Sequence, residues 1–263
     1  MTMNVVVCVK YVPDATAERH FEADNTVDRE GADGLLSELD EYAVEQALQI
    51  KENTSADVKV TVLSVGPEDA ESAVRKALQM GADQGVHVMD DVMAGSDAMA
   101  TSLVLAEAIK KLPYDLVICG MGSTDGAMGV MPAMLSERLG VPGLTLGSEI
   151  SVDGCTVRIR RDSDAATTTV EGELPLVASV TDQSGEARYP SFKGIMAAKK
   201  KPVETWSLAD LGVDASQVGL SASWTAVASA EPRPPRMQGE VVTDEDGSGA
   251  AALVEFLASK KFI

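Results

Sequence analysis

Short apolar runs alternate with amphipathic helical patterns over the first half of the chain, and this order strongly limits the possible folds. Apolar runs of strand length occur at Met3–Val9, Val58–Val65, Val86–Met89 and Tyr114–Cys119. Helical patterns follow at Leu39–Lys51, at Glu68–Met80 with Gly81 as αL cap, at Asp97–Lys111 with Ser96 as N-cap, and from near Met128 to Leu139. Such alternation favours right-handed crossovers, so we predict an α/β fold: a mainly parallel sheet with helices on both faces.

Beyond Leu139 the hydrophobic pattern changes to two-residue alternation, which predicts strands. The segments are Leu144–Val152, Thr156–Arg161, Thr167–Glu173 and Leu176–Val180, and Asp153-Gly154 is a hairpin turn signal between the first two. We expect an antiparallel hairpin extension of the sheet. Arg158, Arg160 and Arg161 lie in it, and an exposed strand face with acidic partners is favoured over a phosphate or flavin contact.

The last part of the chain has a different composition. EPRPPRMQGE carries Pro232, Pro234 and Pro235, which predict an extended arm, and AAALVEFLASKKF predicts a helix. We therefore divide the chain into an α/β domain, 1–230, and a C-terminal arm and helix, 231–263. The apolar side chains of that helix need cover, and we expect a partner subunit to bury them rather than the chain's own domain; they are Leu253, Val254, Phe256 and Leu257.

Charge and cysteine usage exclude several classes of protein. The 263 residues carry a formal net charge of −19, which argues against nucleic acid or an anionic membrane as a partner. No apolar run reaches the roughly 18 residues of a membrane span, and MTMNVVVCVK leads directly into a strand without a signal pattern, so we expect a cytoplasmic protein without membrane insertion. Cys8, Cys119 and Cys155 are far apart in apolar runs, which favours buried thiols over a disulfide or a metal site.

The loop between Gly120 and Gly129 is the best candidate for a ligand site. Its glycines permit close backbone approach, and the helix that follows directs unpaired N–H groups and its positive dipole end toward the loop. Ligands of parallel sheets bind beyond the carboxyl ends of the strands, which here also brings in Val9-Lys10 and Ser64 to Gly66. A phosphate is the natural occupant, although the spacing matches no standard nucleotide motif and a bare tight turn explains it equally well.

The chain offers no recognisable catalytic group. His20 lies in a polar segment, and His87, within a strand pattern, is more typical of a satisfied core or edge residue. Neither histidine lies near a Ser or Cys in a nucleophile motif. A nucleotide-binding α/β domain without bond-breaking groups indicates a carrier or a subunit, and we predict no catalytic residue.

Six stretches together carry a resemblance to a known family over nearly the whole chain. They are VVVCVKYVPD, DEYAVEQALQIKE, VRKALQMGADQGVHV, VRIRRDSDAATTTVEGELPLVASV, ARYPSFKGIMAAKKK and ADLGVD. In order and spacing they resemble the β subunit of electron-transfer flavoprotein. The resemblance implies an αβ heterodimer whose FAD, held mainly by the α subunit, carries electrons from dehydrogenases to a downstream acceptor, with AMP in the β subunit.

The same resemblance assigns site residues. The AMP phosphate is expected at the loop of Gly120 to Gly129. The adenosine is expected beside Val9, Val65 and the residues near Leu39 to Glu41. The expected contacts are Val9, Leu39, Asp40, Glu41, Val65, Gly120, Ser123, Thr124, Asp125, Gly126, Ala127, Met128, Gly129 and Val130. Two departures from the family pattern are a shortened loop, Ser123 to Gly129, and Ser37-Glu38 in place of an Asn-Pro pair.

A docking element for dehydrogenases is expected at YPSFKGIMAAKKK, residues 189–201. Pro190 and Gly194 punctuate this segment, and Phe192 matches the family's anchoring Leu. The predicted contacts are Tyr189, Phe192, Ile195, Met196, Lys199 and Lys200. In the alternative, Ile195 and Met196 pack beneath the loop and the lysines form a solvated face.

Two other functions stay open. In a bifurcating branch of the family the β subunit binds a second FAD and accepts hydride from NADH, and only then is the chain part of an NADH-oxidising enzyme. That branch has a loop of the form D-x-x-T-A-Q-V-G, which Asp125 to Gly129 does not reproduce. A free-standing adenine-nucleotide sensor needs no partner, and the C-terminal arm fits it poorly.

Overall fold

The computed structural model describes residues 2–18, 20–29, 31–231, 234–235, 239, 241–244 and 247–263. The chain divides into two compact units, Met1–Ala228 and Ser229–Ile263, which we describe separately. Within the predicted arm, Pro234 and Pro235 have no regular secondary structure, and Pro232 lies outside the described residues.

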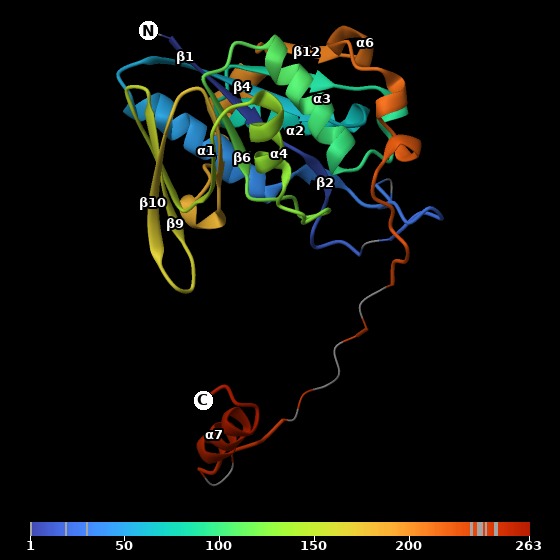
Figure 1. Ribbon diagram of the computed structural model, residues 1–263. Helices are drawn as coiled ribbons and strands as arrows, with labels where there is room; N and C mark the ends of the chain where they lie inside the picture. Colours follow the sequence, from blue (N-terminus) through green and yellow to red (C-terminus); the bar gives the residue numbers. More distant parts are fainter. Residues whose placement is uncertain are drawn as a thin grey trace. The chain divides into compact units, whose positions relative to one another are not determined.

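The first unit is built on a seven-stranded parallel sheet (Figure 1), which confirms the predicted fold class. The strand order is β12-β5-β4-β1-β6-β11-β7, and β1 aligns in parallel with β4 on one side and β6 on the other. The strands are β1 Thr2–Cys8, β4 Asp57–Val65, β5 Gln84–Val88, β6 Leu116–Gly120, β7 Gly143–Gly147, β11 Leu176–Val180 and β12 Val203–Trp206. A short antiparallel pair, β2 (Tyr11–Pro13) and β3 (Gly34–Leu36), follows β1.

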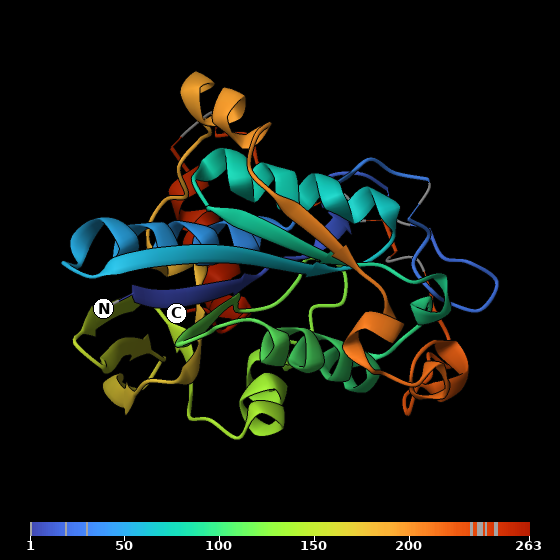
Figure 2. The ribbon, with the colours of Figure 1, turned by 90° about the horizontal axis from the view of Figure 1, so that it is seen from above.

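Helices cover both faces of this sheet (Figure 2). Helices α1 (Glu38–Asn53) and α2 (Glu71–Met80) lie on one face, and α3 (Ala98–Lys111) and α4 (Met131–Leu139) on the other. Two shorter helices follow, α5 (Phe192–Ala198) and α6 (Leu208–Leu211).

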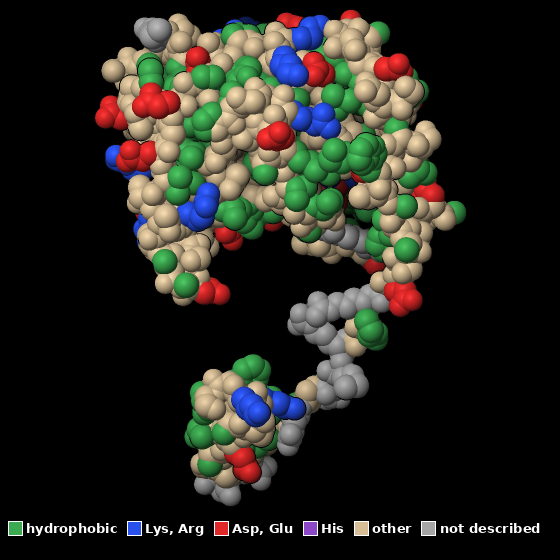
Figure 3. Space-filling model, viewed as in Figure 1, with side chains coloured by type: hydrophobic (Ala, Val, Ile, Leu, Met, Phe, Trp, Pro, Cys, Tyr) green, Lys and Arg blue, Asp and Glu red, His purple; other side chains and the backbone are tan. Residues whose placement is uncertain are grey.

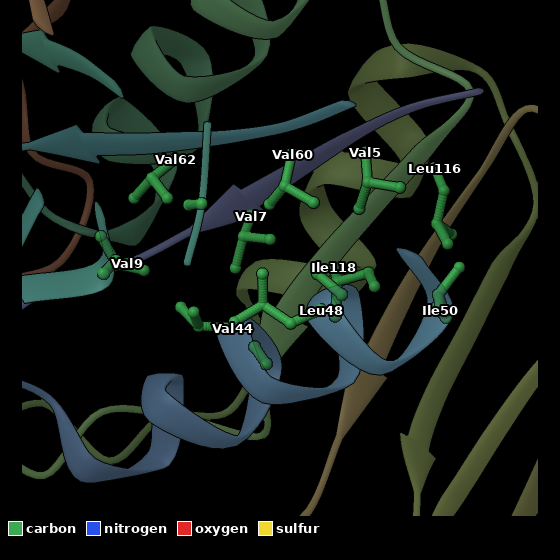
Figure 4. Packing of buried hydrophobic residues seen from close by; sticks show 14 of the residues in the cluster. Val5, Val7, Val9, Val44, Leu48, Ile50, Val60, Val62, Leu116 and Ile118 are labelled. Carbon is green, nitrogen blue, oxygen red and sulfur yellow. The ribbon is translucent and has the colours of Figure 1, made fainter. Parts of the chain in front are cut away.

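The hydrophobic core consists of two clusters, one on each face of the main sheet, because successive residues of a strand point to opposite faces. Val5, Val7 and Val9 pack toward Val44 and Leu48 of α1 (Figure 4). Val6 and Cys8 instead join the cluster that contains Leu135 of α4. The continuous apolar run at the start of the chain therefore marks a strand buried on both sides.

Three helix ends differ from the prediction. Helix α3 is capped by Asp97, whose carboxylate accepts from the Ala100 N–H at 3.0 Å, and not by Ser96. Helix α4 begins at Met131, not near Met128, which lies in the preceding loop and is 59% exposed. Gly81 ends α2 as expected, but with φ 147° and ψ −11°, outside the αL region.

The hairpin region forms its own sheet instead of extending the main one. The predicted strand Leu144–Val152 divides at buried Ser148 into β7, which joins the main sheet, and β8 (Glu149–Asp153). Strands β8, β9 (Thr156–Asp162) and β10 (Thr167–Glu173) form a separate antiparallel sheet.

Two of the three arginines of β9, Arg158 and Arg160, have the local acidic partners that we expected. Arg158 pairs with Glu171 at 2.6 Å, and Arg160 pairs with Glu149 at 2.8 Å and with Asp162 at 3.2 Å. Arg161 donates to the Thr145 carbonyl at 2.9 Å.

Two of the three cysteines are buried as predicted, Cys8 and Cys119, but Cys155 in the β8–β9 turn is exposed. His87 is also buried, with Nε2 3.2 Å from the Gly66 carbonyl oxygen, as expected of a satisfied core residue. None of the helices among the described residues is long and apolar enough to cross a membrane.

In the described part of the second unit, the chain forms the helix α7 (Gly249–Ser259). Its apolar side chains lie on the surface of this unit (Figure 3), with Leu253 58%, Val254 56% and Phe256 46% exposed. The described part of this unit buries none of the residues of α7.

Candidate functional site

The candidate site lies where β4, β1 and β6, three adjacent strands, reach the same edge of the sheet. Because the strands are parallel, Val9 and Lys10, Ser64 to Gly66, and the loop after Gly120 follow their carboxyl ends together. Helix α1 begins at this edge, where the Ser37 N–H donates to the Lys10 carbonyl at 2.9 Å.

Asp40, in the first turn of α1, contacts both the segment after β1 and the end of β6. This buried side chain near the start of α1 accepts from the backbone N–H of Lys10 at 2.8 Å. A Cβ on Gly120 would come within 2.6 Å of both Asp40 Oδ1 and the Leu39 carbonyl oxygen, so only glycine permits this approach of β6 to α1. Burial raises the pKa of Asp40 to about 7, against the opposing effect of the Lys10 and Gly120 N–H groups and the Lys10 charge.

Asp125 organises the loop itself. Its carboxylate, only 2% exposed, pairs with Lys10 Nζ at 2.8 Å and with Arg29 Nη2 at 2.7 Å. Burial tends to raise the pKa of Asp125, but the charge and hydrogen bond of Lys10, with hydrogen bonds from Ser123 and Arg29, hold it well below its usual range. Two cations thus meet one carboxylate beside the loop.

The backbone of the loop is tightly turned. Ala127 has φ 50° and Gly129 has φ 64°, both in the left-handed region. The Ala127 N–H donates to the Ser123 carbonyl at 3.0 Å, and the Gly126 N–H donates to Asp125 Oδ1 at 2.7 Å. Two N–H groups that we had expected to bind phosphate are therefore engaged within the loop.

Three buried hydroxyl groups around the site have no hydrogen-bond partner among the described residues. They belong to Ser37 before α1, Ser64 at the end of β4 and Thr124 in the loop. A buried hydroxyl without a partner is costly, so these groups are ready to bond a polar ligand. Lys10 and Arg29 add two cationic groups, which is the chemistry that a phosphate needs.

The structure brings together most of the residues expected at the site. Val9 is buried at the end of β1, and its N–H donates to the Leu63 carbonyl at 2.9 Å. Glu41 is affected mainly by burial and by the charges of Lys76 on α2 and Glu38, and burial raises its pKa. The charges that act on Glu41 therefore lie on α1 and α2, and not in the loop. Val130 is the N-cap residue of α4, and its side chain is not involved in capping.

Sequence reasoning missed Arg29 and Ser37 as site residues. It placed Lys10 and Ser64 at strand ends where ligands bind, but gave their side chains no role. Arg29 lies in a polar, irregular segment 96 positions from Asp125, and no local pattern points to it. Its one available signal was its positive charge in a protein of net charge −19.

Comparison with known proteins identifies the family of this chain. Residues 24–211 match the family described as Electron transfer flavoprotein domain. The chain is 46% identical over 265 residues to the electron transfer flavoprotein subunit beta of Mycobacterium bovis, with 99% of each chain covered. The chain belongs to the electron transfer flavoprotein family.

Further relatives support a β-subunit type within the electron transfer flavoproteins. The subunit beta of Clostridium acetobutylicum is 36% identical, covering 99% of this chain and 100% of its own. The caffeyl-CoA reductase-Etf complex subunit CarD of Acetobacterium woodii is 32% identical, with the same coverage. An electron transfer role follows from these full-length matches.

Residues 189–201, the segment that we expected to dock dehydrogenases, carry exposed apolar side chains. Tyr189 is 93%, Phe192 81%, Met196 48% and Ile195 38% exposed, so these side chains form an apolar surface beside exposed Lys199 and Lys200. Ser191 caps α5 by accepting from the Gly194 N–H at 3.0 Å. The alternative in which Ile195 and Met196 are buried beneath the loop does not match this geometry.

Proposed function

We propose that this chain is the β subunit of a heterodimeric electron transfer flavoprotein that carries electrons from dehydrogenases to a downstream acceptor. The FAD that accepts and releases the electrons is held mainly by the α subunit, and this chain binds AMP. The observation that carries the AMP assignment is the cluster of unpaired hydroxyls together with Lys10 and Arg29 at the ends of β4, β1 and β6. The full-length similarity to curated β subunits supports the α-subunit partner.

The phosphate of AMP is expected between the loop and the two cations. Lys10 and Arg29 have side chains 41% and 36% exposed, so each has N–H groups free of Asp125 that face solvent. Thr124, Ser37 and Ser64 supply buried hydroxyls that lack a partner among the described residues. In this arrangement Asp125 orients the cations rather than binding the ligand.

Nucleotide analysis of the purified heterodimer tests this assignment. After denaturation we expect one AMP and one FAD per heterodimer. Arg29→Gln should lower AMP content while FAD content stays the same. Arg158→Gln is the matched control, because Arg158 pairs with Glu171 on the separate sheet. Two FAD and no AMP would identify a bifurcating β subunit, and AMP in a stable monomer without any partner would identify a sensor.

The α subunit is also the expected partner of the second unit. Exposed Leu253, Val254 and Phe256 on α7 form the kind of apolar surface that subunit interfaces bury. Truncation after Ala230 should weaken assembly without unfolding the first unit. A truncated chain that binds the α subunit as tightly as the full chain would contradict this role.

The docking surface for dehydrogenases is proposed to be the apolar surface of Tyr189, Phe192, Ile195 and Met196. Since Phe192 is 81% exposed, Phe192→Ala should leave folding stability within about 0.5 kcal/mol of wild type. Loss of an apolar anchor should raise the apparent KM for the dehydrogenase by about 10- to 100-fold. FAD and AMP contents should not change. Val92→Ala, at a half-exposed site outside this segment, is the control. A wild-type KM for Phe192→Ala would show that the docking surface lies elsewhere.

A cytoplasmic location completes the proposal, in keeping with the free thiols of Cys8 and Cys119.

A further inference from the structure

A network of ion pairs lies directly at the base of the docking segment. Arg188, the residue before Tyr189, donates from Nε to Glu45 Oε2 at 2.7 Å and from Nη2 to Glu45 Oε1 at 3.0 Å. Its other side donates to both oxygens of Glu52, at 2.6 and 3.0 Å. Its backbone N–H also donates to Glu45 Oε2, at 3.1 Å. One guanidinium thus binds two carboxylates of α1, each through two hydrogen bonds.

The acceptors of this network are firmly placed. Glu45 is only 6% exposed, lies in the middle of α1 and also accepts from Gln49 at 3.0 Å. Gln46, the next residue on the helix, donates to the Ser184 carbonyl at 2.8 Å. This bond fixes the turn Asp182–Ser184, which precedes Arg188 in the chain. Burial tends to raise the pKa of Glu45, but the hydrogen bonds from Arg188 outweigh it and lower that pKa, so the pair is ionised at neutral pH.

The other end of the docking segment is fixed to α2. A Cβ on Gly194 would come within 2.5 Å of the Gln79 carbonyl oxygen, so the backbones of α5 and α2 touch at this point. Ala198 is buried, and Lys201 Nζ donates to the Leu78 carbonyl at 2.9 Å. Tyr189 and Phe192 therefore project from a short stretch held at both ends.

We infer that Arg188 is a positioning residue for partner docking: by clamping the chain to Glu45 and Glu52, it holds Tyr189 and Phe192 in the arrangement that the dehydrogenase binds. The inference rests on the proposed docking role of this segment. A free loop pays an ordering cost when it binds, and a loop that is already ordered does not. Arg suits this task because its planar fork engages carboxylates through paired hydrogen bonds, which Lys cannot reproduce.

The test is a double-mutant cycle on the assembled heterodimer, with the apparent KM for the dehydrogenase as readout. Arg188→Lys should raise KM by about tenfold with an unchanged maximal rate, because it affects encounter and docking rather than electron transfer in the complex. In a Phe192→Ala background the same substitution should change KM less than twofold, since the anchor that Arg188 positions is already absent. Lys110→Gln, which breaks an exposed ion pair with Glu107 on α3, is the control and should have no effect.

A second measurement reports on the segment itself. Hydrogen exchange of the Gly194 and Ile195 amides, which bond to Ser191, should accelerate in Arg188→Lys while exchange within α1 stays slow. If Arg188→Lys folds poorly, Glu52→Gln removes one arm of the clamp at a side chain that is 56% exposed and should raise KM in the same direction.

The outcomes separate the two proposals. If Phe192→Ala raises KM but Arg188→Lys and Glu52→Gln do not, the positioning role is wrong and the docking surface stands. If Phe192→Ala has no effect, the docking surface itself is wrong. If Arg188→Lys raises KM by the same factor with and without Phe192, Arg188 contacts the partner directly and the positioning role is overturned.

Discussion

Gly120→Ala is the sharpest test of how the candidate site is built. The added Cβ would lie 2.6 Å from Asp40 Oδ1 and 2.6 Å from the Leu39 carbonyl oxygen, and the second of these is backbone that cannot rotate away. Overpacking of this kind costs about 1–3 kcal/mol, and a displaced Asp40 would also weaken its bond to the Lys10 N–H by about 1 kcal/mol. We expect a loss of about 2–4 kcal/mol, which lowers Tm by roughly 4–16 °C for a chain of this size.

Gly122→Ala is the matched control in the same loop. Its Cβ would meet nothing closer than 3.7 Å, and its φ is not in the left-handed region, so stability should stay within about 0.5 kcal/mol of wild type. Thermal unfolding of both variants, with nucleotide content measured on the same samples, should separate them clearly. Equal Tm values for the two variants would refute the close contact between β6 and α1.

Three further predictions concern single carboxylates. Asp125 has a lowered pKa, so its stabilising contribution is present above about pH 4 and is lost as pH falls further; in urea unfolding, the advantage of wild type over Asp125→Asn should be largest above pH 5 and shrink below pH 4. Asp40 has the opposite sign: with a folded pKa of about 7, its contribution declines as pH rises from about 4 to 7, and Asp40→Asn should remove that decline. Asp97→Ala removes the cap of α3 and the acceptor for the Trp224 and Thr225 N–H groups. It should cost about 1–2 kcal/mol and speed hydrogen exchange at those two amides, and slow exchange there would contradict it.

Elements defined by a local pattern were predicted well from the sequence. Thr167–Glu173 and Leu176–Val180 have the bounds that two-residue alternation indicated. The parallel sheet followed from the order of apolar runs, and the position of the site followed from the rule that ligands bind beyond strand ends.

The errors arose where distant residues decide between local alternatives. Ser96 and Asp97 are both good N-cap residues, but the Ser96 hydroxyl accepts from the Gly219 N–H at 2.7 Å, which leaves Asp97 to cap α3. The apolar periodicity of α4 extends back to Met128, but Gly129 with φ 64° interrupts the helical backbone. Strand β7 ends where Leu146 adopts φ 64° and Ser148 bonds to Asp162, a contact that no local pattern signals.

The strand order also has a consequence for synthesis. Strand β5, residues 84–88, lies next to β4 on one side, and its other neighbour, β12, is made only at residues 203–206. As the chain leaves the ribosome, β5 therefore presents an unpaired edge while more than a hundred further residues are added. Unpaired edges invite pairing with other chains, so the nascent protein is most exposed to aggregation in this interval. The four-residue strand β12 thus covers β5 only late in synthesis and itself becomes the short edge strand of the finished sheet.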